Sequence, residues 1–158
     1  MTTSLPENGQ PAQPTLTYDD SFTRTCLYFT TNRLSRAITR MADDAFAPTG
    51  LTPAYGYVVR LVIGKPGITQ KELSDTLSIA PSTLTRFIDK LEVKKLVERK
   101  GHGKTVLVYP TDKGNELGPS ILEASKRLKK NYEEVLGKDV AAMLTSNQEQ
   151  MSDLMERS

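Results

Sequence analysis

Small hydroxyl-bearing and cationic side chains cluster within the segment 81–94. The candidate contacts among them are Ser82, Thr83, Thr85, Arg86 and Lys90. If the segment is helical, these residues lie on or beside the side opposite its apolar residues. Arg can bind guanine through two hydrogen bonds, and small hydroxyl residues let a helix approach the base edges of the major groove. The pattern therefore favours contact with double-stranded DNA over a merely solvated helix surface, and the hydroxyl residues could fill either role.

A cationic hairpin is predicted directly after this segment. Strands are expected over 96–100 and 105–109, joined by the tip Gly101-His102-Gly103-Lys104. A thin basic ribbon of this kind can reach the DNA backbone or the minor groove beside a helix that lies in the major groove. Arg99 and Lys104 are its candidate contacts, with Lys104 meeting a phosphate as a point charge.

Local charge supports a polyanionic partner more than total charge does. Between positions 80 and 104 seven cationic side chains stand against three anionic ones, whereas the whole chain carries a net charge of only +2. A solvated helix surface could also produce this excess. Asp89 lies within it and would repel phosphate, so we expect it to orient a cation of the hairpin, either Arg99 or Lys104.

A helix-turn-helix must position these residues. Thr69-Gln70-Lys71-Glu72 has the pattern of a capping box, in which hydroxyl and carboxylate satisfy the free amides of a first helical turn. A turn is expected at 78–80, and Pro81 is suited to the start of the second helix. The second helix would bury Leu84, Phe87, Ile88 and Leu91.

Amphipathic segments flank this central module. Helices are predicted over 19–47, 52–64, 111–136 and 140–156, with Thr52 and Thr111 as capping residues. A module of this size could not bury the apolar sides of the terminal helices, whereas pairing with a second chain could. The predicted fold class is mainly α with a small β-hairpin wing, a winged helix-turn-helix between N- and C-terminal dimerisation helices.

This organisation divides the chain into four parts. We expect a flexible N-terminal arm over 1–15, a dimerisation helix over 16–50, the winged helix-turn-helix module over 51–111 and C-terminal dimerisation helices over 112–158. Because the predicted helices alternate with clear stop residues, the boundaries follow from the sequence pattern.

Composition argues against several other classes. There is one cysteine and one histidine, and no Gly-rich phosphate loop or metal-ligand cluster is present in the sequence. We therefore expect no enzymatic activity, no cofactor and no metal. The sequence contains no apolar run long enough for a membrane span and no signal-peptide core, so a cytoplasmic location and no membrane partner are expected.

Several short motifs, in order, resemble the MarR-type winged-helix regulators over roughly 26–136. They are Leu51-Thr52-Pro53, Thr69-Gln70-Lys71-Glu72-Leu73, Pro81-Ser82-Thr83-Leu84-Thr85-Arg86, Leu91-Glu92, Leu96-Val97-Glu98-Arg99 and Thr111-Asp112-Lys113-Gly114. The resemblance implies a homodimer that binds a pseudo-palindromic operator, regulates transcription, usually by repression, and often releases DNA when a small aromatic or phenolic effector binds.

The resemblance also assigns roles to residues. It places Ser82, Thr83, Thr85 and Arg86 on bases and phosphates, and Thr69 and Gln70 on the DNA backbone. It implies an effector pocket lined by residues such as Tyr55, Tyr57 and Arg60. The hairpin departs from the family pattern because its tip lacks the usual Asp-x-Arg signature.

Two alternatives remain within the same fold. Cys26 could make the protein a redox-sensing repressor, although the cysteine of the peroxide-sensing branch aligns with Tyr28, and a structural Cys26 is favoured. The winged helix could instead dock a protein partner. The basic outward side of 81–94 argues against that second alternative.

Overall fold

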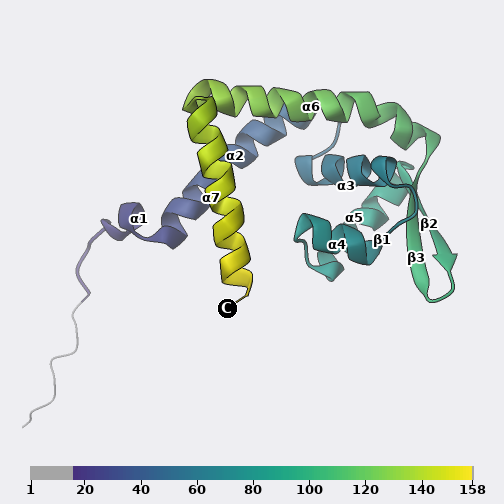
Figure 1. Ribbon diagram of the computed structural model, residues 1–158, viewed down its shortest axis with the longest axis horizontal. Helices are drawn as coiled ribbons and strands as arrows, with labels where there is room; N and C mark the ends of the chain where they lie inside the picture. Colours follow the sequence, from purple (N-terminus) through teal and green to yellow (C-terminus); the bar gives the residue numbers. More distant parts are fainter. Residues whose placement is uncertain (1–15, 158) are drawn as a thin grey trace, which may run out of the picture. The chain divides into compact units, whose positions relative to one another are not determined.

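The computed structural model describes residues 16–157 as helices with one small sheet (Figure 1). The chain divides into two compact units at Ser35. The predicted arm 1–15 lies outside the described residues. The elements in order are α1 (Phe22–Thr25), α2 (Leu27–Phe46), η1 (Ala47–Thr49), α3 (Pro53–Gly64), β1 (Ile68–Thr69), α4 (Gln70–Leu77), α5 (Pro81–Val93), β2 (Val97–His102), β3 (Thr105–Pro110), α6 (Asp112–Leu136) and α7 (Lys138–Glu156).

The first helix begins later than predicted. Instead of one helix over 19–47, a single turn, α1, precedes Cys26, whose extended backbone (φ −85°, ψ 127°) separates it from α2. The hydroxyls of Thr23 and Thr25 donate to the carbonyls of Asp20 and Ser21. Such local side-chain bonds compete with regular helix, which explains the interruption that apolar spacing alone did not reveal.

Caps define the helices around the central module. In the capping box of α4, Glu72 N–H donates to Thr69 Oγ1 at 3.1 Å and Thr69 N–H donates to Glu72 Oε2 at 2.9 Å, as predicted. The hydroxyl of Thr111 caps α6 by accepting from Gly114 N–H at 3.0 Å. Thr52 was expected to do the same for α3, but its side chain makes no capping bond. The fixed φ of Pro53 at the first position suffices to start that helix.

The sheet has three strands in the order β1-β3-β2. The hairpin is longer than predicted: β2 runs through His102 and β3 through Pro110, so only Gly103 and Lys104 form the turn. Gly103 has φ of 61°, which Gly adopts without steric cost. Strand β1 was not predicted, because two residues are too few to show a periodic pattern.

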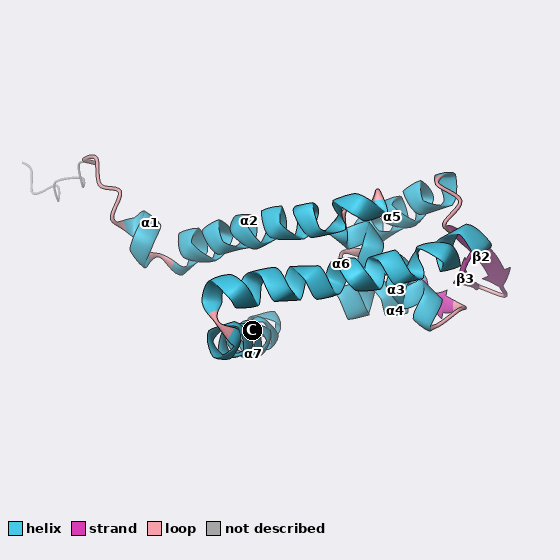
Figure 2. Ribbon diagram, turned by 90° about the horizontal axis from the view of Figure 1, so that it is seen from above, coloured by secondary structure: helices cyan, strands magenta, loops and turns pink. Residues whose placement is uncertain are grey.

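The core of the second unit lies between α3, α5, α6 and the sheet. Leu84, Ile88 and Leu91 of α5 are completely buried, as predicted, and Phe87 is partly buried against the ring of Tyr55. The other large side chains removed from water include Phe46, Val58, Val62, Leu73, Val108 and Ile121. In Figure 2 the hairpin β2–β3 lies at one end of α3 and α6.

The turn between α4 and α5 is held by a buried hydroxyl. Ser74 Oγ donates to the carbonyl oxygen of Ile79, and Ile79 N–H donates back to the carbonyl of Ser74. Ser78, which ends α4, has φ of 50°. The two hydrogen bonds between Ser74 and Ile79 stabilise the turn and so offset the cost of the left-handed backbone at Ser78. They also set the direction in which α5 leaves α4.

The last helix starts earlier than predicted and is mostly exposed. It begins at Lys138 instead of Val140, directly after Gly137 with φ of 82°. Ala141 is its buried residue, whereas Val140 and Met143 expose about half of their surface (46% and 57%). Within the described part of the chain, the apolar side of α7 is therefore left largely open to solvent.

The first turn of α6 packs tightly against the backbone of Leu96, the residue that precedes β2. A Cβ added to Gly114 would lie 2.1 Å from the carbonyl oxygen of Leu96, whereas one added to Gly118 would lie 3.5 Å from Ile63 Cδ1. Gly114→Ala should lower the free energy of unfolding by about 1–3 kcal/mol, because backbone atoms must move. The matched Gly118→Ala should be neutral or stabilise by up to about 1 kcal/mol through helix propensity.

Urea unfolding of the two variants measures both values. Equal effects of the two substitutions would show that the close approach of α6 to Leu96 does not constrain the fold.

Candidate nucleic-acid interface

The predicted polar side of α5 faces solvent. Ser82, Thr85, Arg86 and Lys90 are exposed and Thr83 is half-buried, while the opposite side of the helix lies in the core. Residues of the sequence-predicted set therefore share one accessible helix surface. Among the described residues, no acidic side chain lies within hydrogen-bonding distance of Arg86. The geometry permits a groove-binding helix whose Arg86 guanidinium is exposed.

Thr69 and Gln70 lie at the start of α4, beside this surface. The hydroxyl of Thr69 is occupied by the capping box, which holds the first turn of α4. The side-chain amide of Gln70 donates to Thr85 Oγ1 at 3.3 Å, and Thr85 Oγ1 in turn donates to the carbonyl of Pro81 at 3.0 Å. The structure thus links the two helices through the very side chains that the sequence assigned to DNA.

Arg99 lies on β2 and points back to the helix pair. Its guanidinium is hydrogen-bonded to Gln70, Asp89 and Glu92 and to the carbonyl oxygen of Thr85. Of the two partners expected for Asp89, the structure shows Arg99 and not Lys104. Sequence reasoning missed Glu92 as the second carboxylate. Its signal was the i, i+3 spacing from Asp89, which places both carboxylates on one side of α5.

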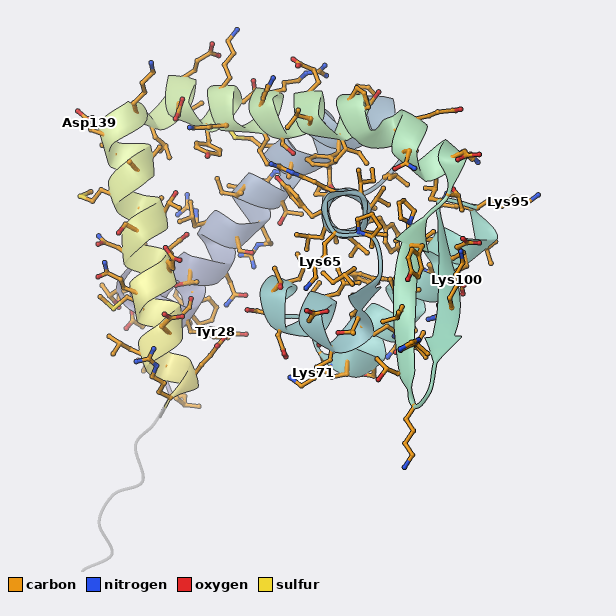
Figure 3. All side chains as sticks on the ribbon, turned by 45° about the vertical axis from the view of Figure 1, so that its right-hand side comes forward. Tyr28, Lys65, Lys71, Lys95, Lys100 and Asp139 are labelled. Atoms are coloured by element: carbon orange, nitrogen blue, oxygen red, sulfur yellow. The ribbon has the colours of Figure 1, made fainter. Side chains whose placement is uncertain are left out.

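The hairpin presents cations along its length. Lys104 and His102 are exposed near the tip. Lys100, labelled in Figure 3, lies 4.8 Å from the ring centroid of Tyr109 and pairs with Glu98 at 2.9 Å. The hydrogen bond that the ammonium of Lys100 donates to Glu98 raises the pKa of Lys100, so this lysine stays cationic. Lys71, also labelled in Figure 3, is exposed on α4 and pairs with Asp75 at 2.6 Å.

The residues predicted for an effector pocket do not converge. Tyr55 stacks edge-on against Phe87 with ring centroids 4.9 Å apart, and Tyr57 packs against Phe46 at 5.1 Å. Arg60 donates to Ser125 Oγ at 3.3 Å and lines a cleft of about 570 Å³. The two tyrosines are absent from that lining, because their rings are packed against Phe46 and Phe87.

Apart from Arg60, the lining of that cleft was not predicted. It consists of Arg60, Leu61, Gly64, Lys65, Ile68, Glu72, Asp75 and Thr76. Cationic and anionic groups are both present, and Lys65 and Glu72 are paired with each other. The cleft therefore offers polar groups of both signs, which suits a ligand with a charged part more than a purely apolar one.

Cys26 is free and half-buried at the break between α1 and α2. The neighbouring Arg24 pairs with Asp20 at 3.5 Å. Residues 16–157 hold no cluster of three or more His, Cys, Asp or Glu side chains that could bind a metal ion. None of the helices in the same range has the length and apolarity needed to cross a membrane.

The helix pair α4–α5 and the adjacent hairpin β2–β3 define a winged helix-turn-helix protein. Residues 49–105 match the family model described as the MarR family. The resemblance that the motifs predict is confirmed: this segment of the chain is a MarR-family winged helix.

Known proteins agree with this assignment. The chain is 28% identical over 92 residues to an uncharacterised HTH-type transcriptional regulator, YybA, of Bacillus subtilis (strain 168); the match spans 56% of this chain and 61% of that relative. The transcriptional repressor CouR bound to p-coumaroyl-CoA is similar in fold (TM-score 0.77, 24% identity, 85% of this chain and 96% of that one). So is a mutant MarR from E. coli complexed with operator DNA (TM-score 0.74, 24% identity, 84% and 99%). These likenesses confirm the predicted fold class.

The capping box beside the interface is expected to respond to pH. The ammonium of Lys65, together with the N–H and hydroxyl of Thr69, lowers the pKa of Glu72 from 4.5 to about 2. A depressed folded-state pKa means that ionised Glu72 stabilises the fold above about pH 4.5, and that this contribution is lost as the pH falls toward about 2. Glu72→Gln retains a capping side chain but not the charge.

Urea unfolding between about pH 6 and pH 2.5 tests this prediction. The stability difference between wild type and Glu72→Gln should shrink as the pH falls, and Lys65→Met should remove part of the same pH dependence. Parallel curves for wild type and Glu72→Gln over this range would refute it.

Proposed function

We propose that this protein is a sequence-specific DNA-binding transcription regulator that acts as a repressor, with α5 in the major groove of its operator. The observation that carries this proposal is the exposed polar side of α5. Arg86 and Lys90 supply charge there, and Ser82 and Thr85 leave room for close approach to base edges. Phosphate contacts would supply most of the affinity, and Arg86 would supply specificity. The proposed role is binding, in the cytoplasm, and not catalysis.

Dimerisation is the second part of the proposal. The exposed apolar residues of α7 include Val140, Met143, Met151 and Leu154, each at least 46% exposed. Contiguous apolar surface of this kind marks an interface in soluble proteins. Two copies related by a twofold axis would present two α5 helices, which matches a pseudo-palindromic operator.

An effector that releases DNA is the third part. The likeness to CouR, which is bound to p-coumaroyl-CoA in one structure and to a 23-mer DNA duplex in another, supports a small aromatic or phenolic effector. Arg60 at the cleft beside α3 is the residue best placed to bind an acidic part of such a compound. Tyr55 and Tyr57 would contribute only if their aromatic pairs opened.

The base-reading role of Arg86 can be measured directly. Arg86→Ala should weaken binding to the operator by about 1–3 kcal/mol, and binding to random DNA by much less, because only the operator offers the matched base. The operator is sought in the DNA upstream of the protein's own gene, and binding is titrated at two salt concentrations. Arg127→Ala, which removes an exposed arginine of α6, is the matched control and should change neither affinity. Equal losses on operator and random DNA would exclude base reading by Arg86.

The redox alternative makes the opposite prediction for Cys26. If the protein is not a thiol sensor, Cys26→Ser should bind the operator like wild type, and peroxide should have the same effect on both proteins. Band-shift titration with and without peroxide measures this. Peroxide release of wild type that is abolished in Cys26→Ser would establish the thiol switch instead.

A further inference from the structure

One guanidinium joins the three elements of the proposed DNA-binding surface. Arg99 Nε donates to Gln70 Oε1 at 3.0 Å, Nη1 donates to Asp89 Oδ1 at 2.7 Å and to a carboxylate oxygen of Glu92, and Nη2 donates to the carbonyl of Thr85 at 3.1 Å. The backbone N–H of Arg99 also donates to Glu92 at 2.9 Å. Strand β2 is thereby tied to α4 and α5.

These bonds leave Arg99 little capacity for DNA. A guanidinium has five N–H groups, and four of them are directed at protein acceptors. The side chain is only 21% exposed, and its two carboxylate partners outweigh its charge. A bidentate contact with guanine or phosphate would require at least one of these bonds to break.

The same bonds determine how the side chain of Gln70 is oriented. Arg99 Nε–H can only donate, so the Gln70 atom that faces it must be the oxygen and not the nitrogen. The amide nitrogen then points to Thr85 Oγ1, which lies 3.3 Å away. One N–H of the amide remains for an outside acceptor. Gln70 therefore offers DNA one N–H donor, and its oxygen, which already accepts from Arg99, is held toward β2 and is less available than the oxygen of a free Gln for the paired donor–acceptor contact with adenine.

The same donor-to-acceptor order of hydrogen bonds continues into α5. Thr85 Oγ1 accepts from Gln70 and gives its single hydrogen to the carbonyl of Pro81 at 3.0 Å. Its hydroxyl can thus meet DNA only as an acceptor. The hydrogen bonds form one directed chain, which runs from Arg99 through Gln70 and Thr85 to Pro81.

We propose that Arg99 is a positioning residue for operator specificity, which fixes Gln70 as a donor and Thr85 as an acceptor at the DNA surface and does not itself bind DNA. The proposal rests on the proposed function. It revises the role of Arg99 that the sequence suggested, and it assigns the chemistry that Gln70 and Thr85 can present to bases.

Two measurements separate positioning from DNA contact. Arg99→Met should lower the ratio of operator to random-DNA affinity about tenfold or more, yet leave unchanged the slope of log affinity against log salt concentration. A phosphate contact would reduce that slope by about 0.9. Lys100→Met, the next residue of β2, removes the same charge and should leave the ratio unchanged. Gln70→Met, which keeps Arg99 paired with its carboxylates, should lower the ratio by a similar factor and covers the case in which Arg99→Met does not fold.

A measurement without DNA tests the series of hydrogen bonds from Arg99 to Pro81 by itself. In urea unfolding, the losses in the folding equilibrium constant caused by Arg99→Met and Gln70→Met should not multiply, so the double variant should lose less than their product. Multiplicative losses, or a reduced salt slope with an unchanged ratio, would overturn the proposal. If wild type shows no preference for any operator, the proposed function fails. The unfolding measurements alone then decide whether Arg99 and Gln70 are coupled through their hydrogen bond.

Discussion

Complete burial of one side of α5 is the constraint on which the rest of the structure depends. Leu84, Ile88 and Leu91 are wholly removed from water. Burial of each such side chain contributes about 1.5–3 kcal/mol, far more than any single polar contact on the exposed side. Because this apolar side fixes the rotation of the helix, Ser82, Arg86 and Lys90 must face outward whatever else they contact.

The polar contacts refine what burial has set. Burial of α5 does not orient the side chains of Gln70 and Thr85. Arg99 holds the amide of Gln70, and the hydroxyl of Thr85 is held by that amide and by the carbonyl of Pro81. An exposed ion pair would add little. The guanidinium here is four-fifths covered and meets two carboxylates, a carbonyl and an amide, so removing it would leave partly desolvated acceptors without donors. The network therefore contributes to stability as well as to the orientation of Gln70.

The far end of α5 is attached to α6. The hydroxyl of Thr111 donates to the carbonyl of Lys95 at 2.6 Å, and Lys113 Nζ donates to the carbonyl of Lys94 at 3.0 Å. These carbonyls follow the last turn of α5, where Lys95 adopts φ of 59°. A displacement of α6 would therefore be passed to α5 at this junction.

Local signals in the sequence determined the helix pair, its caps and its outward residues. The capping box at Thr69, the start at Pro81 and the apolar spacing of Leu84, Ile88 and Leu91 act over a few residues, so they can be recognised without the fold. The interruption at Cys26 was missed because hydroxyl-to-backbone bonds leave the apolar spacing unchanged. The strand β1 was missed because only pairing with β3 makes two residues a strand.

Tertiary structure alone decided which polar groups meet. Arg99 and Gln70 are separated by 29 residues, and no periodic pattern connects them. Their contact exists because β2 lies beside α5, where the backbone N–H of Arg99 donates to Glu92. The sequence therefore determined which side chains of α5 face outward, whereas the fold decided which of the predicted DNA-binding groups are still free to bind, since a donor already bonded within the protein has no hydrogen left to offer.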